Sequence, residues 1–315
     1  MAILASSQDF YKHIINSMNY HGLRDWALLL ALVAMWGSSF MFNKLAVATV
    51  PPATIVAGRL TVGAIILVAA VYARGLRLPK FGRAWRPYCA FAMMGNAIPF
   101  YLITWGQQVV ASALAGILMA IMPLATLVLA HFLVHGERMT RNRVLGFSLG
   151  FLGILLLMGP ATLAGVGGPA LHVVSQFAVL SGALCYAANS VMTRLMANGD
   201  VLVASAATLA VAAAVMLPLA LVFDRPWALV PSASSGAAVL WLGIGPTAIA
   251  TLCYFRLIGS AGPTFMSVVN YLSPAVAVVL GVALMGEHPG AEAYAALGLI
   301  LGGIALSRLR RRDAA

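Results

Sequence analysis

Two stretches of the chain carry polar and aromatic side chains at the same helical spacing. The first set is Trp36, Ser39 and Asn43, and the second is Tyr186, Asn189 and Thr193. Residues at positions i, i+3 and i+7 lie on one face of a helix. Such groups could stack on a small solute and hydrogen-bond to it, or they could bond one apolar helix to another. Spacing alone leaves both interpretations open, but it predicts that both sets face the interior of the protein.

More residues of these types occur in other apolar segments. The further candidates for lining a solute pathway are Lys44, Tyr101, Trp105, Thr251, Tyr254, Asn270 and Tyr271. Four prolines also fall inside apolar segments, namely Pro99, Pro123, Pro246 and Pro274. A proline inside a helix frees a backbone carbonyl and permits a bend. We therefore predict helix kinks and gates near a solute cavity, although simple tolerated kinks are also common in membrane helices.

The charged residues near the segment ends are open to two interpretations. Lys44 and Arg59 could attract an anionic group of a solute, or they could extend to water and bond the carbonyls at helix ends. The second interpretation is favoured for Arg59, and Lys44 is left undecided. Glu137 and Glu287 follow glycines at turns, where we expect them to cap or pin the chain.

The residues needed for catalysis or metal binding are missing from the apolar segments. No Asp or Glu falls in the middle of one, and the three cysteines, Cys89, Cys185 and Cys253, lack metal-ligand spacing. An intramembrane enzyme would need a nucleophile with a base, a metal cluster or paired aspartates. The sequence therefore predicts no enzyme, no metal and no cofactor. The missing carboxylate also argues against a cation/proton exchanger of the small-multidrug type, and leaves facilitated diffusion or exchange open.

Composition indicates that most of the surface faces lipid. The chain is 62% hydrophobic and 9% charged, and its mean hydropathy is +0.96. A soluble protein carries about 25% charged residues. The net charge of +11 does not indicate nucleic-acid binding, because the arginines lie in short loops between apolar segments. The expected partners are the lipid bilayer and a small-molecule substrate, with no nucleic acid.

Ten helical spans of about 20 residues fit the apolar pattern. They are predicted at Trp26–Ala48, Pro52–Tyr72, Tyr88–Gln107, Ala111–Val134, Arg143–Leu157, Val173–Met196, Val201–Phe223, Gly236–Gly259, Pro263–Met285 and Ala291–Leu306. The predicted units are a cytoplasmic N-terminal segment at 1–24, a first repeat at 25–160, a linker at 161–172, a second repeat at 173–309 and a basic cytoplasmic tail at 310–315. The expected fold is an all-α polytopic membrane protein.

The two predicted halves repeat one another at a nearly constant offset. Lys44 and Arg194 end similar segments, and 194 − 44 = 150; Gly136-Glu137 recurs as Gly286-Glu287 at the same offset. Each half holds five spans, an odd number, so the halves should be inserted upside down relative to each other. All Lys and Arg residues except Lys44, Arg59 and Arg225 fall on one side of this arrangement. The excess of positive charge predicts that both termini are cytoplasmic.

The ordered set of motifs resembles the EamA family of ten-helix permeases within the drug/metabolite transporter (DMT) superfamily. The resemblance rests on Trp36-Gly37-Ser38-Ser39 with Lys44, on Pro123 followed by Gly136-Glu137, and on the repeat with Pro274, Gly286-Glu287 and Gly302-Gly303. It covers about residues 26 to 307. Tyr186 stands where the family has Trp in the second half. The resemblance implies transport of small metabolites, often amino acids and often export.

We predict a secondary transporter in the inner (plasma) membrane of a bacterium that works by alternating access. The substrate is expected to be an amino acid or a similar metabolite, and export is favoured. The alternative is a flippase for a lipid-linked carrier with the same fold. Gly146-x-x-x-Gly150 and Gly298-x-x-x-Gly302 look like close-packing faces, either within the chain or in a homodimer, so a monomer and a homodimer both remain open.

Overall fold

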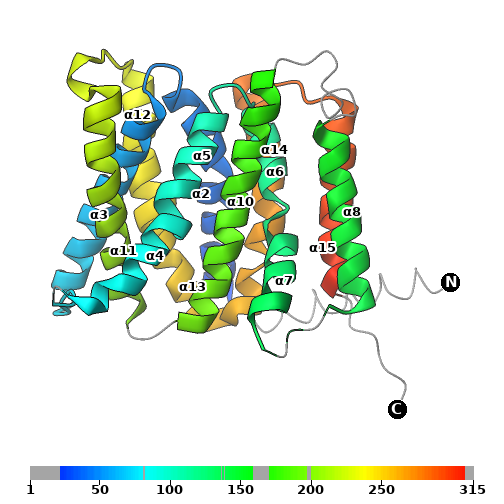
Figure 1. Cartoon of the computed structure of the whole chain (residues 1–315), viewed down its shortest axis with the longest axis horizontal. Coiled ribbons are helices and arrows are strands. Elements are labelled where there is room, and N and C mark those ends of the chain that lie inside the picture. The colour runs from blue at the N-terminus through cyan, green and yellow to red at the C-terminus, as the bar shows by residue number, and fades with distance from the viewer. Residues whose placement is uncertain are drawn as a thin grey trace.

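The computed structural model describes residues 22–308 except residues 81, 136, 138, 159–169 and 197–199. Every regular element in this part of the chain is helical (Figure 1). Most of the predicted N-terminal segment, most of the linker and the basic tail at 310–315 lie outside the described residues. Helices are the expected outcome for long apolar runs, because only a helix satisfies its own backbone hydrogen bonds in lipid.

The chain folds as ten spans in two repeats. The helices of the first are α2 (Leu23–Ala46), α3 (Pro52–Ala73), α4 (Arg86–Ala92), η2 (Met93–Ala97), α5 (Ile98–Gly106), α6 (Ser112–Met119), α7 (Met122–Leu133) and α8 (Arg141–Met158). Those of the second are α10 (Ala170–Met196), α11 (Val201–Leu219), η3 (Ala220–Asp224), α12 (Ala233–Leu242), η5 (Gly243–Ile249), α13 (Ala250–Met266), α14 (Val269–Met285) and α15 (Ala291–Arg308). Short helical turns, η1 (Arg83–Trp85) and η4 (Pro226–Ala228), lie in loops.

Length and hydropathy identify eight of the spans directly among the described residues. The other two are the shorter apolar α14 and the stack of α4, η2 and α5. The fifth span begins at Arg141, two residues before the predicted edge. Gly262, with φ of 80°, interrupts α13 and separates the eighth span from the ninth. Glycine suits this position because the left-handed backbone would strain a residue with a Cβ.

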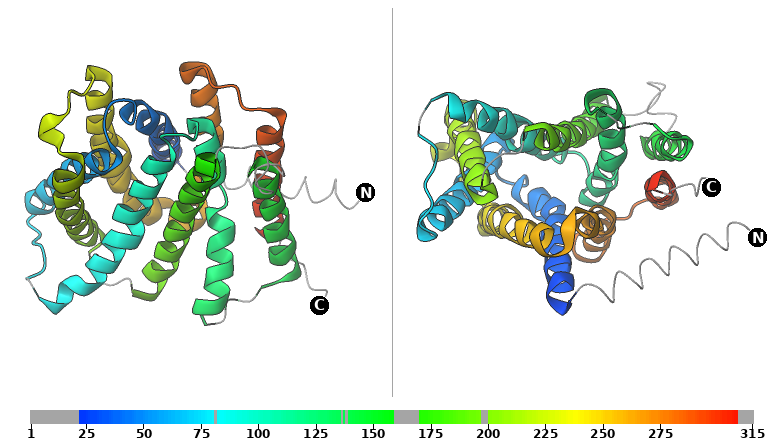
Figure 2. Two further views of the ribbon diagram at one scale, coloured as in Figure 1. Left: turned by 45° about the horizontal axis from the view of Figure 1, so that its top comes forward. Right: turned by 90° about the horizontal axis from the view of Figure 1, so that it is seen from below.

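The packing of the two repeats is symmetric under exchange of the halves. The first span, α2, packs on the eighth and ninth, and the sixth span, α10, packs on the third and fourth. The second and seventh spans, α3 and α11, contact each other, as do the fifth and tenth, α8 and α15. In Figure 1, α2 runs upward and α10 downward, as inverted repeats require. The pair α8 and α15 stands at one edge of the bundle in Figures 1 and 2.

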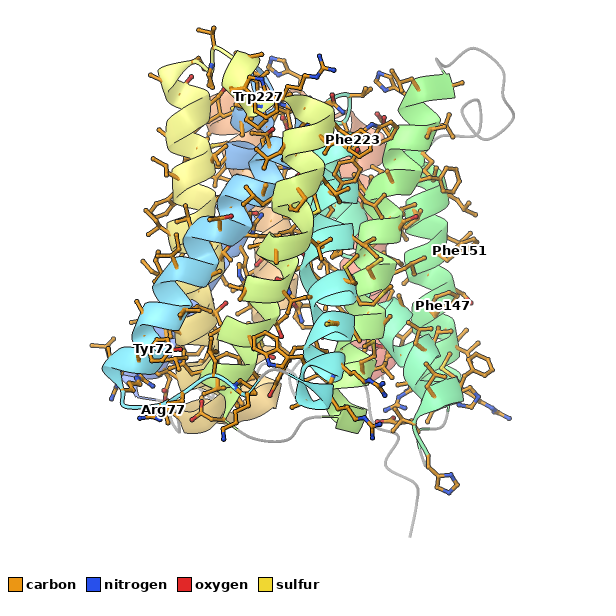
Figure 3. The ribbon with its side chains drawn as sticks, turned by 60° about the vertical axis from the view of Figure 1, so that its left-hand side comes forward. Tyr72, Arg77, Phe147, Phe151, Phe223 and Trp227 are labelled. Atoms are coloured by element: carbon orange, nitrogen blue, oxygen red, sulfur yellow. The ribbon has the colours of Figure 1, made fainter. Side chains whose placement is uncertain are left out.

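The lateral surface of the bundle is apolar and the charges gather at its ends (Figure 3). Phe147 and Phe151 project outward from α8, and Phe151 is exposed. Arg77 marks what we call the basic end, which also carries residues 22 and 308, and Trp227 marks the opposite end. Exposed aromatic and aliphatic side chains on every span fit a lipid-facing surface.

Three of the four prolines that the sequence singled out lie in or next to a helix interruption. Pro246 lies inside the π-helical η5, and Pro99 follows the π-helical η2 at the start of α5. A π-helical turn changes the hydrogen-bond register, which accommodates the missing proline N–H. Pro123 is near the start of α7, directly after a turn that breaks the fourth span, whereas Pro274 lies within a continuous α14. The ninth span is broken earlier, by a turn at residues 267–268.

Only some of the glycines predicted to pack closely form the contact between α8 and α15. Gly146 lies against the backbone of Gly303, and a Cβ on either residue would collide with the other's carbonyl group. Ser307 completes this contact between α8 and α15. Gly298 has open space around it, and Gly302 approaches a neighbour only at 3.7 Å. Gly298 and Gly302 therefore do not form a close-packing face within the chain, because the helix turns Gly303 toward α8 instead, whereas Gly146 packs within the chain. A packing face at 298 and 302 in a homodimer stays a prediction.

Candidate functional site

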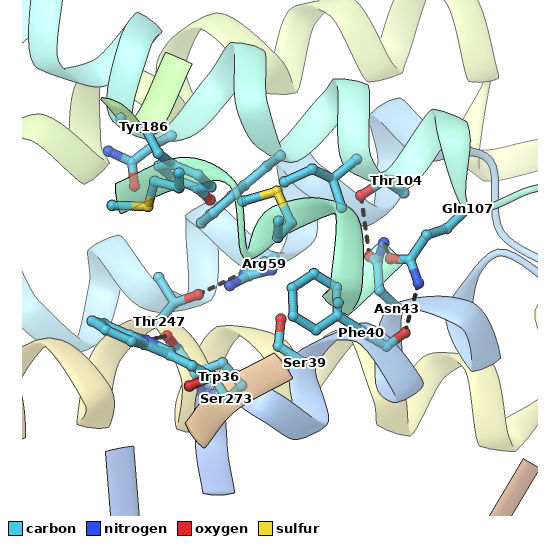
Figure 4. Close-up of a pocket in the computed structure, with 18 of the residues that line it drawn as sticks. Trp36, Ser39, Phe40, Asn43, Arg59, Thr104, Gln107, Tyr186, Thr247 and Ser273 are labelled. Atoms are coloured by element: carbon cyan, nitrogen blue, oxygen red, sulfur yellow. Dashed lines mark hydrogen bonds between the residues drawn. The ribbon is translucent and has the colours of Figure 1, made fainter. Parts of the chain in front are cut away.

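A cavity of about 300 Å³ lies in the centre of the bundle, between the two repeats (Figure 4). Residues from both halves line it, and most of them are apolar. The residues predicted from the sequence that line it are Trp36, Ser39, Asn43, Tyr186, Thr251, Asn270, Pro123, Pro246 and Pro274. Central position, mixed lining and contributions from broken helices are the features of a small-molecule site in a membrane protein.

Other predicted residues lie behind this lining or away from it. Tyr254 packs beside Trp36, with 6.0 Å between ring centroids, and Asn189 presses its amide against Gly95. Tyr271 lies under the guanidinium group of Arg308. These residues come from the expected helices, but their side chains support the wall of the cavity or lie beyond it.

Two aromatic residues and one proline of the third span also lie outside the cavity lining. Tyr101 is 39% exposed and lines a separate surface pocket that reaches α11 and Asp224. Trp105 and Pro99 are absent from the residues that surround the central cavity. The third span presents Phe100, Ile103, Thr104 and Gln107 to the cavity instead. These four residues mark the face of the helix that turns inward, which is rotated from the one we predicted.

A buried hydrogen-bond network joins α2 to α5 at one side of the cavity. Asn43 Nδ2 donates to Gln107 Oε1 at 2.7 Å, and Thr104 Oγ1 donates to Asn43 Oδ1 at 3.1 Å. Gln107 Nε2 donates to the Phe40 carbonyl oxygen at 2.9 Å. Asn43 is 3% exposed and Gln107 is fully buried. Both ends of the Asn43 amide are thus engaged within the protein, although Asn43 contributes to the cavity wall.

Replacement of Asn43 by alanine should therefore lower stability as well as transport. The change leaves the buried Gln107 carbonyl without its donor and the Thr104 hydroxyl without its acceptor. We expect a loss of about 2 kcal/mol in the free energy of unfolding. Thermal unfolding of the purified protein in detergent measures it, with Ser205→Ala, which loses a bond only to its own helix, as control. An unchanged melting temperature would contradict a structural role for this network.

Arg59 projects into the cavity, so the prediction that it extends to water at a helix end is wrong. Its side chain is 8% exposed, and its Nε donates to Thr247 Oγ1 at 2.8 Å. The guanidinium carbon lies 3.8 Å from the centre of the Phe100 ring. Arg59 is seven residues beyond Pro52, which places it about 10 Å along α3. The distance of Arg59 from the start of the span was the feature of the sequence that could have indicated an inward position.

Several polar groups of the lining have no internal hydrogen bond within the described part of the chain. The side chains of Ser39 and Asn270 have none, and the Ser273 hydroxyl is buried without a partner. Trp36, by contrast, donates its Nε1 to the Pro246 carbonyl oxygen at 3.2 Å, the kind of carbonyl that a broken helix exposes. Thr251 donates to the Thr247 carbonyl oxygen. The cavity therefore offers unengaged hydroxyl and amide groups to a bound solute.

At the end of the bundle opposite the basic end, the partly buried carboxylate of Glu287 links the two repeats. Glu287 accepts hydrogen bonds from Ser112 N at 2.7 Å, Ser112 Oγ at 2.8 Å and Ala113 N at 2.8 Å, so it caps α6 of the other repeat. Its counterpart Glu137 forms an ion pair with Arg143, at 2.8 Å. Capping by Glu287 agrees with the sequence-based expectation.

Lys44 belongs to the same end of the bundle. Its Nζ donates to the carbonyl oxygens of Gln107, at 2.7 Å, and Val110, at 3.2 Å. These carbonyls lie between the third and fourth spans, so the structural interpretation of Lys44 holds and it does not line the central cavity. In the described residues, no group of three or more His, Cys, Asp or Glu side chains could hold a metal ion.

Comparison with known proteins identifies the family. The model of the EamA-like transporter family matches residues 25–159 and 174–309. The chain belongs to the EamA-like transporter family. The two matched segments show that this EamA-like transporter contains the family domain twice. It is therefore a multi-pass membrane protein of the DMT group, and its family consists of transporters and not of enzymes.

Individual relatives of this EamA-like transporter are distant but extend over most of its length. It is 27% identical to the uncharacterized inner membrane transporter YedA of Escherichia coli K12 over 89% of each chain. It is 28% identical to the aromatic amino acid exporter YddG of Ancylobacter novellus, over 92% of this chain and 99% of the relative. A solved crystal structure with 24% identity superposes with a TM-score of 0.63 over 90% of this chain and 95% of the other, which shows a shared fold.

Proposed function

We propose that the protein is a secondary transporter that exports a small metabolite, an amino acid or a similar compound, across the inner membrane of a bacterium. The observation that carries this proposal is the central cavity, which both inverted repeats line with unengaged polar groups. The name of the relative YddG, an aromatic amino acid exporter, supports the direction and the substrate class. The cavity volume of about 300 Å³ suits a solute of that size.

Alternating access is supported by the inverted repeats and by the polar bonds that link them at the two ends of the bundle. At the end opposite the basic end, Ser112 donates to Glu287, Thr54 to Asp224 and Ser235 to the Leu45 carbonyl oxygen. At the basic end, Ser260 donates to Asp25. Inverted repeats with similar sequences can exchange conformations, which would open the cavity to the other side.

The orientation proposed for this cycle places the basic end and both termini in the cytoplasm. The described loops at that end carry the arginines that the sequence assigned to the inner side, among them Arg77 and Arg83. The end capped by Glu287 would then face outward. The alternative, a flippase for a lipid-linked carrier, receives less support, because a cavity of about 300 Å³ suits a small solute better than a long lipid chain.

The proposal is tested by counterflow in proteoliposomes loaded with unlabelled amino acids and small metabolites. We expect saturable exchange of at least one labelled amino acid, and dependence on an imposed pH gradient would reveal coupling. Protein that is folded by its thermal unfolding profile but exchanges none of the panel would contradict the proposed substrate class. Exchange of a labelled lipid-linked sugar by the same preparation would support the flippase instead.

Asn270→Ala separates a solute contact from a structural role. Because the Asn270 amide makes no hydrogen bond within the described residues, its loss should leave the melting temperature unchanged. We expect the apparent affinity for the exchanged solute to fall about tenfold, the cost of one hydrogen bond to a polar solute group. The control is Ser205→Ala, which removes a bond within α11 only. Unaltered counterflow kinetics would remove Asn270 from the substrate site.

A further inference from the structure

The central cavity contains one fixed charge, and it is positive. Among the described residues that line it, Arg59 is the single ionised side chain and none is acidic. The one ion pair in the described part of the chain joins Arg143 and Glu137, far from Arg59 in the sequence. Arg59 uses Nε to donate to Thr247, and its terminal Nη groups have no hydrogen-bond partner in the described residues. The cation is thus held in place, and no acidic side chain of the described residues pairs with it.

The contacts of Arg59 orient the guanidinium group for binding an anion. Thr247 fixes the Nε edge, and the Phe100 ring lies against the flat face at 3.8 Å. Thr247 is itself oriented, because its Oγ1 donates to the Leu242 carbonyl oxygen at 2.8 Å. The remaining Nη groups can offer two parallel N–H donors, the geometry that matches a carboxylate. Burial of a charge without a counter-ion is unfavourable, so an anion that enters the cavity gains an interaction that the protein leaves unmet, reduced by the cost of removing the anion from water.

The rest of the lining suits a solute that carries an apolar group beside its anionic group. Phe40, Ile103, Met119 and Met122 line the same cavity as the guanidinium group. Phe40, Ser39 and Ser273 are labelled with Arg59 in Figure 4. Methionine side chains adapt to apolar groups of varied shape. No acidic side chain of the described lining is available to pair with an ammonium group.

We propose that Arg59 binds the carboxylate of the transported solute, and that the site selects amphipathic carboxylates and rejects compounds whose net charge is positive. This inference rests on the proposed function and adds the chemical group that the cavity recognises. Such a site requires a carboxylate on the solute but no amino group, so deaminated acids should bind as well as the amino acids. Lys44 cannot take this role, because its ammonium group is engaged by backbone carbonyls outside the cavity.

Two matched series of probes test the carboxylate requirement on the intact protein. The first is phenylalanine, 3-phenylpropionate and phenylalaninamide, and the second is leucine, 4-methylpentanoate and leucinamide. Binding to the purified protein is measured by isothermal calorimetry, and competition is measured in counterflow. In at least one series, we expect the two carboxylates to bind and the amide to bind about 10- to 100-fold more weakly, as loss of a charged hydrogen-bonded contact predicts.

Substitutions assign the effect to Arg59. Arg59→Gln should weaken carboxylate binding by the same factor and remove the discrimination against the amide, whereas Arg59→Lys should retain part of it. The control is Arg77→Gln, which removes a positive charge from an exposed loop residue. If Arg59→Gln does not fold, the acid and amide comparison on the unmodified protein still decides the question.

The outcomes separate this inference from the proposed function. Amides that bind as tightly as the acids, or unchanged carboxylate affinity in folded Arg59→Gln, would overturn the role of Arg59 even when counterflow of a solute succeeds. Failure of all four carboxylates to bind, together with saturable counterflow of a non-carboxylate from the wider panel, would overturn the carboxylate site and leave the transporter proposal standing. Carboxylate binding without counterflow would support the site and contradict transport.

Discussion

Replacing Gly146 by leucine should prevent α8 and α15 from packing and greatly reduce the yield of folded protein. A Cβ at Gly146 would collide with the carbonyl oxygen of Gly303, and the obstructing atom belongs to backbone that cannot rotate away. The seam also carries buried side chains of the core, including Ile154 and Ile300. We expect a destabilisation of about 3 kcal/mol or more, because overpacking at a backbone contact forces the helices apart.

Gly298→Leu is the matched control for this prediction. Gly298 lies on α15, the same helix that supplies Gly303, but a Cβ there meets no atom within 4 Å. The two variants thus add the same side chain to the same pair of helices, one into the seam and one outside it. Size-exclusion profiles and thermal unfolding in detergent should distinguish them. Equal stability of the two variants would mean that the α8 and α15 contact is not as close as the structure shows.

Glu287→Gln should shift the protein toward a conformation that is open at the end opposite the basic end. The carboxylate accepts three hydrogen bonds at the beginning of α6, where the helix dipole also favours a negative charge. An amide keeps one acceptor and loses the charge. We expect the ratio of open to closed molecules at this end to rise about tenfold, and the transport rate to change with it.

Distances between spin labels measure that shift. Labels on cysteines that replace Gln108 and His288, both exposed, report the separation across the Glu287 contact in a protein whose native cysteines have been removed. Glu292→Gln is the control, because it makes the same change at an exposed glutamate in the first turn of α15. We expect a longer-distance population in Glu287→Gln and none added in Glu292→Gln. An unchanged distance distribution in both would show that Glu287 does not hold this end closed.

The sequence placed Asn43 on the inward face of α2 correctly, but it could not identify what the side chain does there. Gln107, its partner, is 64 residues away and belongs to a span whose inward face was predicted from Tyr101 and Trp105. A helix presents several faces with polar residues, and its rotation is set by the helices that it contacts. The rotation of α5 turned Thr104 and Gln107 toward Asn43 and left Tyr101 outside the cavity.

Arg59 shows the same limit for a charged residue. Its position in the sequence is compatible both with extension to water and with insertion into the bundle, since a long side chain can reach in either direction. The choice depends on Thr247 and Phe100, which come from other spans and provide a hydrogen bond and an aromatic face. Those neighbours are assembled only when the two repeats pack.

The amino-acid sequence by itself determined the membrane class, the ten spans, the duplication and the polar face of the first span. These features follow from composition, period and charge asymmetry, which are properties of contiguous segments. In the sixth span only Tyr186 of the predicted set lines the cavity, and Thr193 is exposed. The tertiary structure decided which polar groups bond to each other and which remain available to a solute. It also decided that Glu287 caps α6 of the other repeat, and that Glu137 forms an ion pair with Arg143. The Glu287 contact depends on the approach of helices that are distant in the chain, so the Gly-Glu motif alone does not identify its partner.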